Sequence, residues 1–153
     1  MPAGWRIVPT HRTAAAFTGQ GARLHGARWN SPGVALVYLS EHLSLAALEV
    51  LVHRQLNRWT WTFLAYRAEW EDGLMQRLEP ATLPKDWRDE PSARSLRDLG
   101  DAWVKAAPAA VLAVPSVVIP EELNYLLNPA HPDFKKIRVH KPKPFAFDPR
   151  LLP

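Results

Sequence analysis

The chain contains no cysteine, which excludes a disulfide framework, a thiolate nucleophile and any zinc or iron–sulfur site with cysteine ligands. It also lacks an apolar run long enough to cross a bilayer, because the longest, from 106 to 120, is interrupted by Pro108 and Pro115. The first residues, MPAGWRIVPTHR, lack the apolar core of a signal peptide. These absences predict a cytoplasmic protein with no place in a membrane.

The motifs of common phosphate and metal sites are missing as well. Neither the GxxxxGK[ST] nor the GxGxxG spacing occurs, so the glycine-rich segment from 19 to 33 is not a standard phosphate loop. The histidines at positions 11, 25, 42, 53, 131 and 140 show no HExxH or other ligand spacing. We therefore expect no metal site.

Positive charge is in slight excess and is scattered. Nineteen Lys and Arg against fifteen Asp and Glu give a net charge of +4 and a pI near 9.7, which favours anionic partners such as a nucleic acid, a nucleotide or an acidic protein. Only 135–143, KKIRVHKPK, concentrates this charge, and a solubilising C-terminal edge explains it better than a binding surface does. A basic nucleic-acid-binding module stays as a distant alternative, since no recognisable binding motif accompanies the charge.

Size and composition fit one globular domain spanning residues 1–153, with 47% hydrophobic and 22% charged residues. The expected strands and helices do not alternate as βαβ units, which predicts an α+β fold. Apolar and β-branched runs predict strands at 4–9, 34–39, 59–70, 110–114, 117–119 and 137–147, the last an edge strand interrupted by prolines. We expect helices at 41–57 and 92–106, a short helix or turn at 121–127, and irregular chain at 13–31 and 74–91.

The segment from 21 to 55 carries the main functional signal. A glycine-bracketed loop with Arg28 leads into a short apolar strand with Tyr38, and the strand leads into a helix with Glu49. Because these residues come from three consecutive elements, we expect them to converge on one cleft. An arginine, a tyrosine and a carboxylate together predict a site for an anionic, sugar-bearing ligand.

Glu49 is the residue that the helix pattern explains least well. Its neighbours at three and four positions are mostly apolar: Leu45, Ala46, Val52 and His53. An unpaired carboxylate is costly to bury, so such a residue usually has a partner or a function. The alternative is a glutamate at the edge of the apolar stripe that reaches water or pairs with His53 or Arg54, and the helix pattern alone favours that alternative.

Arg28 and Tyr38 each have two interpretations. A loop arginine is usually solvated, but one in a glycine-rich loop can bind a pair of phosphate oxygens, and Arg6 and Arg23 are rivals for that role. Tyr38 interrupts an apolar strand. It is either a core residue with a bonded hydroxyl or a ring that stacks on a flat heterocycle.

Ser116 lies between two valine-rich pieces in VPSVVIP and has no convincing histidine base beside it. It is therefore a poor candidate nucleophile, and a hydroxyl that binds ligand or backbone is the better interpretation. Asn124 and Asn128 each have a helix-end or turn explanation, which the local sequence favours.

The order Arg28, Tyr38, Glu49 and Ser116 resembles the RES-domain family, the toxins of bacterial Xre–RES toxin–antitoxin pairs. The segments that carry the resemblance are GARWNSPG, VYLSEHLSLAALE, VPS and NYLLNPAHPDF. They are short, but their order and combination are specific. The resemblance covers residues 5–139 and leaves 140–153 as a C-terminal edge strand or tail of a single RES domain. It implies an ADP-ribosyltransferase-like α+β fold, with mixed, mostly antiparallel sheets and flanking helices.

The resemblance also implies roles for individual residues. Glu49 serves the reacting ribose, Arg28 holds a dinucleotide and Tyr38 packs at its nicotinamide end, so these three count as catalytic. Substrate binding extends to a larger set: Arg28, Tyr38, Ser116, Asn124 and, as a further family position, Arg6.

The implied substrate is NAD+, cleaved between nicotinamide and ribose by hydrolysis or phosphorolysis, so phosphate is a possible second reactant. No cofactor is expected. The alternative activity is transfer of ADP-ribose to a protein target. The implied partner is an Xre-family antitoxin, through which nucleic acid is contacted only indirectly, and a toxin dimer within a larger complex is compatible with the family pattern.

Overall fold

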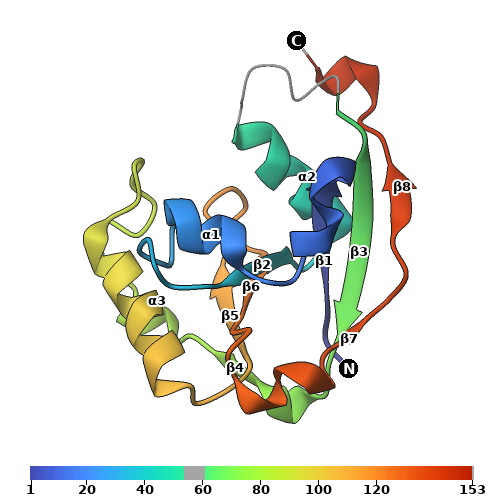
Figure 1. The fold of residues 1–153 in the computed structure, drawn as a ribbon. Helices are drawn as coiled ribbons and strands as arrows, with labels where there is room; N and C mark the ends of the chain where they lie inside the picture. The colour runs from blue at the N-terminus through green and yellow to red at the C-terminus, as the bar shows by residue number, and fades with distance from the viewer. Residues whose placement is uncertain (54–60, 153) are drawn as a thin grey trace.

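The computed structural model describes residues 1–53 and 61–152 (Figure 1). Its α-helices are α1 (Gln20–His25), α2 (Leu43–Val52) and α3 (Arg94–Ala106), and short 3-10 helices lie at Thr10–Ala15, Asp72–Leu74, Pro80–Thr82, Pro132–Lys136 and Pro149–Leu151. Its strands are β1 (Ala3–Pro9), β2 (Val37–Ser40), β3 (Phe63–Glu69), β4 (Met75–Arg77), β5 (Val111–Pro115), β6 (Leu123–Leu127), β7 (Arg138–Val139) and β8 (Lys143–Phe145). None of the helices in these two stretches is long and apolar enough to cross a membrane.

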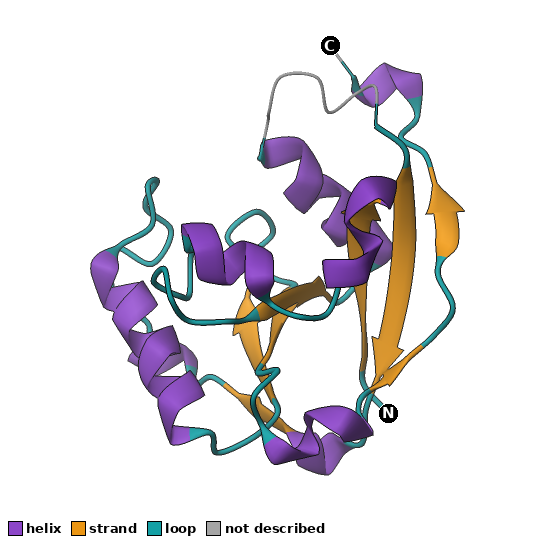
Figure 2. Ribbon diagram, in the orientation of Figure 1, coloured by secondary structure: helices purple, strands orange, loops and turns teal. Residues whose placement is uncertain are grey.

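The strands form one mixed sheet in the order β4-β5-β6-β2-β1-β3-β7, with β8 paired to β3. Every pairing is antiparallel except that of β4 with β5. The junction of β2 with β1 is narrow, since only Trp5 and Ser40 are in register there. The sheet therefore consists of a β4-β5-β6-β2 half and a β1-β3 half that diverge from this junction (Figure 2). The helices flank this sheet, as expected for the α+β fold.

Gly4 allows the two halves to approach each other at the junction. A Cβ atom at this position would lie 3.0 Å from side-chain atoms of both Leu39 on β2 and Tyr125 on β6. Tyr125 in turn packs edge-to-face against Trp70, with ring centroids 5.0 Å apart. This buried aromatic pair joins the end of β3 to the other half of the sheet.

Two helices cover different halves of the sheet (Figure 1). On α3, the buried Leu96 and Trp103 belong to the same hydrophobic cluster as Leu112 on β5 and Leu126 on β6. On α2, the buried Ala46 packs with a cluster that includes Ile7 on β1. Burial of these apolar faces fixes the helices on the sheet.

The helix expected at 41–57 begins later, at Leu43. Ser40 is a buried residue of β2, and the N-cap is His42, which makes no side-chain capping bond. The carboxylate of Glu41 instead accepts the backbone N–H of Leu123 at 2.9 Å. The expected continuation through 54–57 lies outside the described residues.

The predictions for 117–127 were wrong. Residues 117–119 form no strand, because the backbone N–H groups of Val118 and Ile119 both donate to the hydroxyl of Ser116, at 3.1 Å each. Instead of a helix or turn at 121–127, β6 runs from Leu123 to Leu127 and pairs with β5 on one side and β2 on the other. Pairing on both edges satisfies its backbone polar groups.

Two segments expected to be irregular contain regular structure. The short helix α1 lies within 13–31. Its N-cap is Gly19 (φ 73°) and its C-cap is Gly26 (φ 71°), and the helix begins and ends at these glycines because helical residues do not adopt positive φ. Strand β4 lies within 74–91 and pairs with β5. The predicted edge location of the last strand is confirmed, because its two pieces, β7 and β8, pair with no described strand other than β3.

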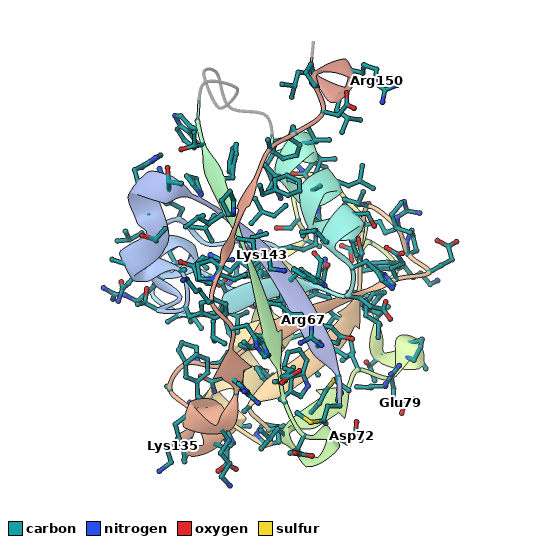
Figure 3. The ribbon with its side chains drawn as sticks, turned by 90° about the vertical axis from the view of Figure 1, so that its right-hand side faces the viewer. Arg67, Asp72, Glu79, Lys135, Lys143 and Arg150 are labelled. Atoms are coloured by element: carbon teal, nitrogen blue, oxygen red, sulfur yellow. The ribbon has the colours of Figure 1, made fainter. Side chains whose placement is uncertain are left out.

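The basic segment at 135–143 lies along this outer edge, where Lys135, Lys136, Lys141 and Lys143 are all exposed. Figure 3 shows Lys135 and Lys143 separated along the C-terminal segment, with Arg67 on β3 between them in this view. The charges are spread along a strand edge, and their solubilising role stays a prediction.

Candidate active site

A cavity of about 1030 Å³ lies where β1, β2, β6, α1, α2 and the loop after α1 meet. Arg6, Arg28, Tyr38, Glu49 and Asn124 all line it. The elements that carry these residues are distant in sequence, and the narrow junction between the halves of the sheet brings them around one space. No group of acidic or histidine side chains able to hold a metal ion occurs among residues 1–53 and 61–152.

Glu49 is half-buried on α2 and is held through one oxygen. Its Oε1 accepts a hydrogen bond from the hydroxyl of Ser116 at 3.0 Å and another from Nδ2 of Asn124 at 2.8 Å. Within the described residues its Oε2 accepts no hydrogen bond, and neither His53 nor any other described cation pairs with it. Arg54, the other partner considered, lies outside those residues. The carboxylate is thus oriented with its second oxygen available to a ligand.

Ser116 orients Glu49 from outside the cavity. It is fully buried at the end of β5, and its hydroxyl accepts the N–H groups of Val118 and Ile119 while it donates to Glu49. Two N–H donors on one hydroxyl polarise its O–H and strengthen the bond that it gives to the carboxylate. Ser116 itself does not line the cavity, so any effect on a ligand passes through Glu49.

Asn124 is the second support, from β6. Its register partner on β2 is Ser40, which places its side chain at the sheet junction. Its Oδ1 is buried and has no hydrogen-bond partner within the described residues. Asn128, in contrast, has the turn role that the sequence favoured, because its side chain bonds Val104 O at 3.2 Å and Ala130 N at 3.0 Å.

Arg6 is a partly exposed residue whose Nε is buried, and it has no counter-ion among the described residues. Its Nη1 donates to the carbonyl of Tyr38 at 2.9 Å, and its Nε has no partner within those residues. Burial lowers the pKa of Arg6 to about 10, because a low-dielectric environment disfavours the charged form. A partly buried guanidinium that faces a cavity without an acid beside it is a ready site for an anion.

Tyr38 lines the cavity, and its hydroxyl is hydrogen-bonded. The hydroxyl donates to Oδ1 of Asn30 at 2.7 Å and accepts the N–H of Trp29 at 3.1 Å. Burial raises the pKa of Tyr38 above its usual range, so the phenol keeps its proton. Both bonds go to neighbours of Arg28, and Tyr38 therefore fixes the loop that carries this arginine.

Arg28 is bound to a distant segment of the chain. Its Nη1 donates to the carbonyls of Asp89 at 2.8 Å and Trp87 at 3.3 Å, and its Nη2 pairs with Oε2 of Glu90 at 2.6 Å. The rival Arg23 does not line the cavity; its Nε bonds Gln20 on α1 at 2.9 Å.

Sequence reasoning missed the residues that hold the Arg28 loop. Asn30 is fully buried and bonds the carbonyls of Ala22 and Val34 in addition to Tyr38. From α3, Asp101 accepts the N–H of Ser31 at 2.9 Å. Their local patterns carry no signal of this role, because all of these bonds depend on tertiary contacts.

Gly100 lets α3 lie directly against this loop. A Cβ atom at Gly100 would lie 1.7 Å from the carbonyl oxygen of Trp29, which no side chain can accommodate without a backbone shift. Helix propensity alone would make Gly100 a residue that weakens the helix expected at 92–106. Its actual role is a close approach between backbones.

Comparison with known proteins agrees with the resemblance. The family model described as RES domain matches residues 3–148. "Toxin Res" of Yersinia enterocolitica is 40% identical over 148 residues, covering 96% of this chain and 97% of the relative. "Prs ADP-ribosylating toxin" of Sphingobium sp. is 41% identical over 155 residues, covering 97% of this chain and 95% of the relative.

A solved structure has the same fold. The toxin in the crystal structure of the M. tuberculosis MbcT–MbcA toxin–antitoxin complex superposes with a TM-score of 0.75, covering 94% of this chain and 84% of that one. Its sequence is 17% identical, so this match bears on the fold, and it confirms the ADP-ribosyltransferase-like α+β architecture. Together with the family match over nearly the whole chain, these findings establish that the protein belongs to the RES domain family.

Proposed function

We propose that this protein is a toxin that cleaves the bond between nicotinamide and ribose in NAD+. The observation that carries the proposal is the arrangement of Glu49, whose Oε1 is held by Ser116 and Asn124 while Oε2 stays unbonded within the described residues. A carboxylate fixed in this way at the wall of a cavity that is also lined by Arg6 and Arg28 suits a substrate with a ribose and phosphates.

Glu49 acts on the ribose that loses its base. Departure of nicotinamide leaves an oxocarbenium-like ribose, and a carboxylate beside it stabilises the developing positive charge. The Glu49 carboxylate also accepts a hydrogen bond from a ribose hydroxyl and so positions the ribose ring. Nicotinamide leaves as a neutral molecule, so the reaction needs no second carboxyl group as an acid.

Arg6 and Arg28 bind the negative part of the substrate. Arg6 has no acidic partner within the described residues, and an anion in the cavity offsets the cost of its burial. Arg28 presents a planar guanidinium that matches phosphate oxygens. The ring of Tyr38 packs at the nicotinamide end, and its hydroxyl keeps the Arg28 loop in place.

The test is incubation of the purified protein with NAD+ and chromatographic measurement of released nicotinamide. Glu49→Gln removes the negative charge while its amide oxygen still accepts from Ser116 and Asn124, so we expect a folded protein without release. Circular dichroism checks the fold of the variant. Undiminished release by folded Glu49→Gln contradicts the role given to Glu49.

The acceptor of ADP-ribose is water or phosphate in this proposal. Added inorganic phosphate distinguishes them, because phosphorolysis raises the rate and yields a phosphorylated ADP-ribose. Transfer to a protein is the second candidate, favoured by the similarity to a relative named as an ADP-ribosylating toxin. NAD+ labelled in the adenylate part leaves label on a macromolecule only if this second reaction occurs.

We also propose that a cognate Xre-family antitoxin neutralises the protein by covering the cavity. The support is the fold shared with a toxin solved in complex with its antitoxin. Co-expression with a small Xre-like protein encoded beside it should relieve toxicity and yield a complex that does not release nicotinamide. Failure of every such neighbour to bind the toxin contradicts this part of the proposal.

A further inference from the structure

Arg28 makes bonds of two different kinds. Its Nη1 donates to the backbone carbonyls of Asp89 and Trp87, whereas its Nη2 pairs with the carboxylate of Glu90 at 2.6 Å. The carbonyls are neutral and belong to the backbone, so they orient the guanidinium. The carboxylate is an anion on a rotatable side chain, so it can leave while Nη1 stays anchored.

The two partners of this ion pair differ in exposure. The side chain of Arg28 is 19% exposed and that of Glu90 is 79% exposed. Pairs with a solvated partner contribute little, typically about 0.2–1 kcal/mol. A phosphate offers the same guanidinium more negative charge and a bidentate geometry. An incoming phosphate therefore competes well for Nη2.

Glu90 and Arg28 both line the cavity that contains Glu49. The other cavity arginine assigned to the substrate, Arg6, makes no ion pair with any described residue. Glu90 thus neutralises Arg28, whereas no described carboxylate neutralises Arg6. This asymmetry marks Nη2 of Arg28 as an anion position that is already filled.

We propose that Glu90 is an internal competitor of the substrate, occupying on Nη2 of Arg28 the position that a phosphate of the dinucleotide takes. This inference rests on the proposed function, because it concerns how the same site admits NAD+. Glu90 sets the affinity for substrate: binding exchanges its carboxylate for a phosphate oxygen while the carbonyls of Asp89 and Trp87 hold the guanidinium. Glu90 takes no part in the bond cleavage.

The test compares Glu90→Gln with the wild-type protein. Glutamine keeps the size of the side chain and removes the competing charge, so we expect the KM for NAD+ to fall about two- to fivefold, the range that a weak exposed ion pair corresponds to. The change should appear in KM and leave kcat in place, because Glu90 does not contact the reacting ribose in this proposal.

Glu79→Gln is the matched control. It removes one negative charge from the same 74–91 segment, but Glu79 is exposed, does not line the cavity and makes no side-chain bond or ion pair within the described residues, so its KM should stay close to wild type. An unchanged or higher KM in Glu90→Gln overturns the proposal. An equal fall of KM in Glu79→Gln also overturns it, because the effect is then one of overall charge.

A binding experiment separates this inference from the proposed activity. Isothermal titration with inorganic pyrophosphate needs no turnover, and Glu90→Gln should bind it about two- to fivefold more tightly than wild type. In an Arg28→Gln background the same change should have no effect. If pyrophosphate binding follows this pattern but nicotinamide is never released, the proposed function fails and the role of Glu90 survives. If nicotinamide is released but Glu90→Gln changes neither KM nor pyrophosphate affinity, the role of Glu90 fails alone.

Discussion

The hydroxyl of Ser116 donates to Oε1 of Glu49 at 3.0 Å across 67 positions of sequence. Ser116 directly follows β5 and Glu49 lies on α2. The bond therefore connects the β5-β6 hairpin to the helix on the other half of the sheet. Each residue has a further partner, Asn124 for the carboxylate and the N–H groups of Val118 and Ile119 for the hydroxyl. Glu49 is consequently oriented by a network that includes two strands and a turn.

Ser116→Ala is expected to lower both activity and stability. Glu49 keeps only the bond from Asn124, so its carboxylate turns more freely and nicotinamide release should fall by up to about 100-fold, the loss that a small misplacement of a catalytic group produces. The partly buried N–H groups of Val118 and Ile119 lose their acceptor, which should cost about 1–3 kcal/mol in the free energy of unfolding. Release assays and urea unfolding measure the two effects.

The alternative to positioning is a serine that only holds the turn. Ser116→Thr distinguishes them, because it keeps the hydroxyl and should recover much of the activity if the added methyl group fits. If Ser116→Ala lowers the free energy of unfolding but leaves kcat unchanged, Ser116 has only a structural role.

Arg6→Met is expected to impair function without harming the fold. The pKa of Arg6 is lower in the folded protein, about 10, than in the unfolded chain, so below pH 10 the full cost of burying the charge is present. Methionine removes that cost and loses one bond to the carbonyl of Tyr38. We expect the free energy of unfolding without ligand to stay constant or to rise by about 1–2 kcal/mol, and the KM for NAD+ to rise at least about tenfold.

The matched control for Arg6 is Arg23→Met. Arg23 is an exposed arginine that bonds only Gln20 through its side chain in the described structure and does not line the cavity, so both stability and KM should change little. Marked destabilisation by Arg6→Met would show that the guanidinium is part of the structural core instead of an anion site.

The sequence located the residues of this cavity better than the elements around them, mainly through the family resemblance. Glu49 stood out because a carboxylate among Leu45, Ala46 and Val52 conflicts with a helix that packs on a sheet. The family resemblance added Ser116 and Asn124, which the structure places on either side of that carboxylate. The roles given to these residues remain predictions.

The incorrect elements have tertiary causes. The pair Glu121-Glu122 after a proline is typical of a helix start, yet β6 follows, since β5 and β2 supply hydrogen bonds on both of its edges. Glycines argued against a helix at 20–25, but two of them lie just outside it and end it. Glu90 and Asp101 act on residues 62 and 70 positions away, so no local window contains their signal.

Gly100→Ala is expected to destabilise the protein although alanine favours helix. Helix propensity contributes about 1 kcal/mol in favour of the change. The new Cβ atom would overlap the carbonyl oxygen of Trp29, and relief of the overlap moves α3 away from the Arg28 loop. We expect a net loss of about 1–3 kcal/mol in the free energy of unfolding and a higher KM for NAD+. Gly73→Ala, where a Cβ meets nothing within 4 Å, is the control and should change neither quantity. A stabilised Gly100→Ala variant with normal KM would mean that the loop does not depend on this contact.

The carboxylate of Glu69 should make stability depend on pH on the acid side. Its pKa is held below the usual 4.5, first by the hydrogen bond from Arg67 and further by His140, and Arg138 also faces it at 3.9 Å. A carboxyl group with a lowered folded pKa stabilises the protein above its unfolded pKa and loses this contribution as the pH falls through the folded value. We therefore expect urea unfolding to show wild type more stable than Glu69→Gln at pH 7, with the difference shrinking below about pH 4.5. Glu79→Gln, an exposed acid without a side-chain bond in the described structure, should show no such dependence. A difference between wild type and Glu69→Gln that stays constant down to pH 3 would mean that the hydrogen bonds of Glu69 do not require its charge.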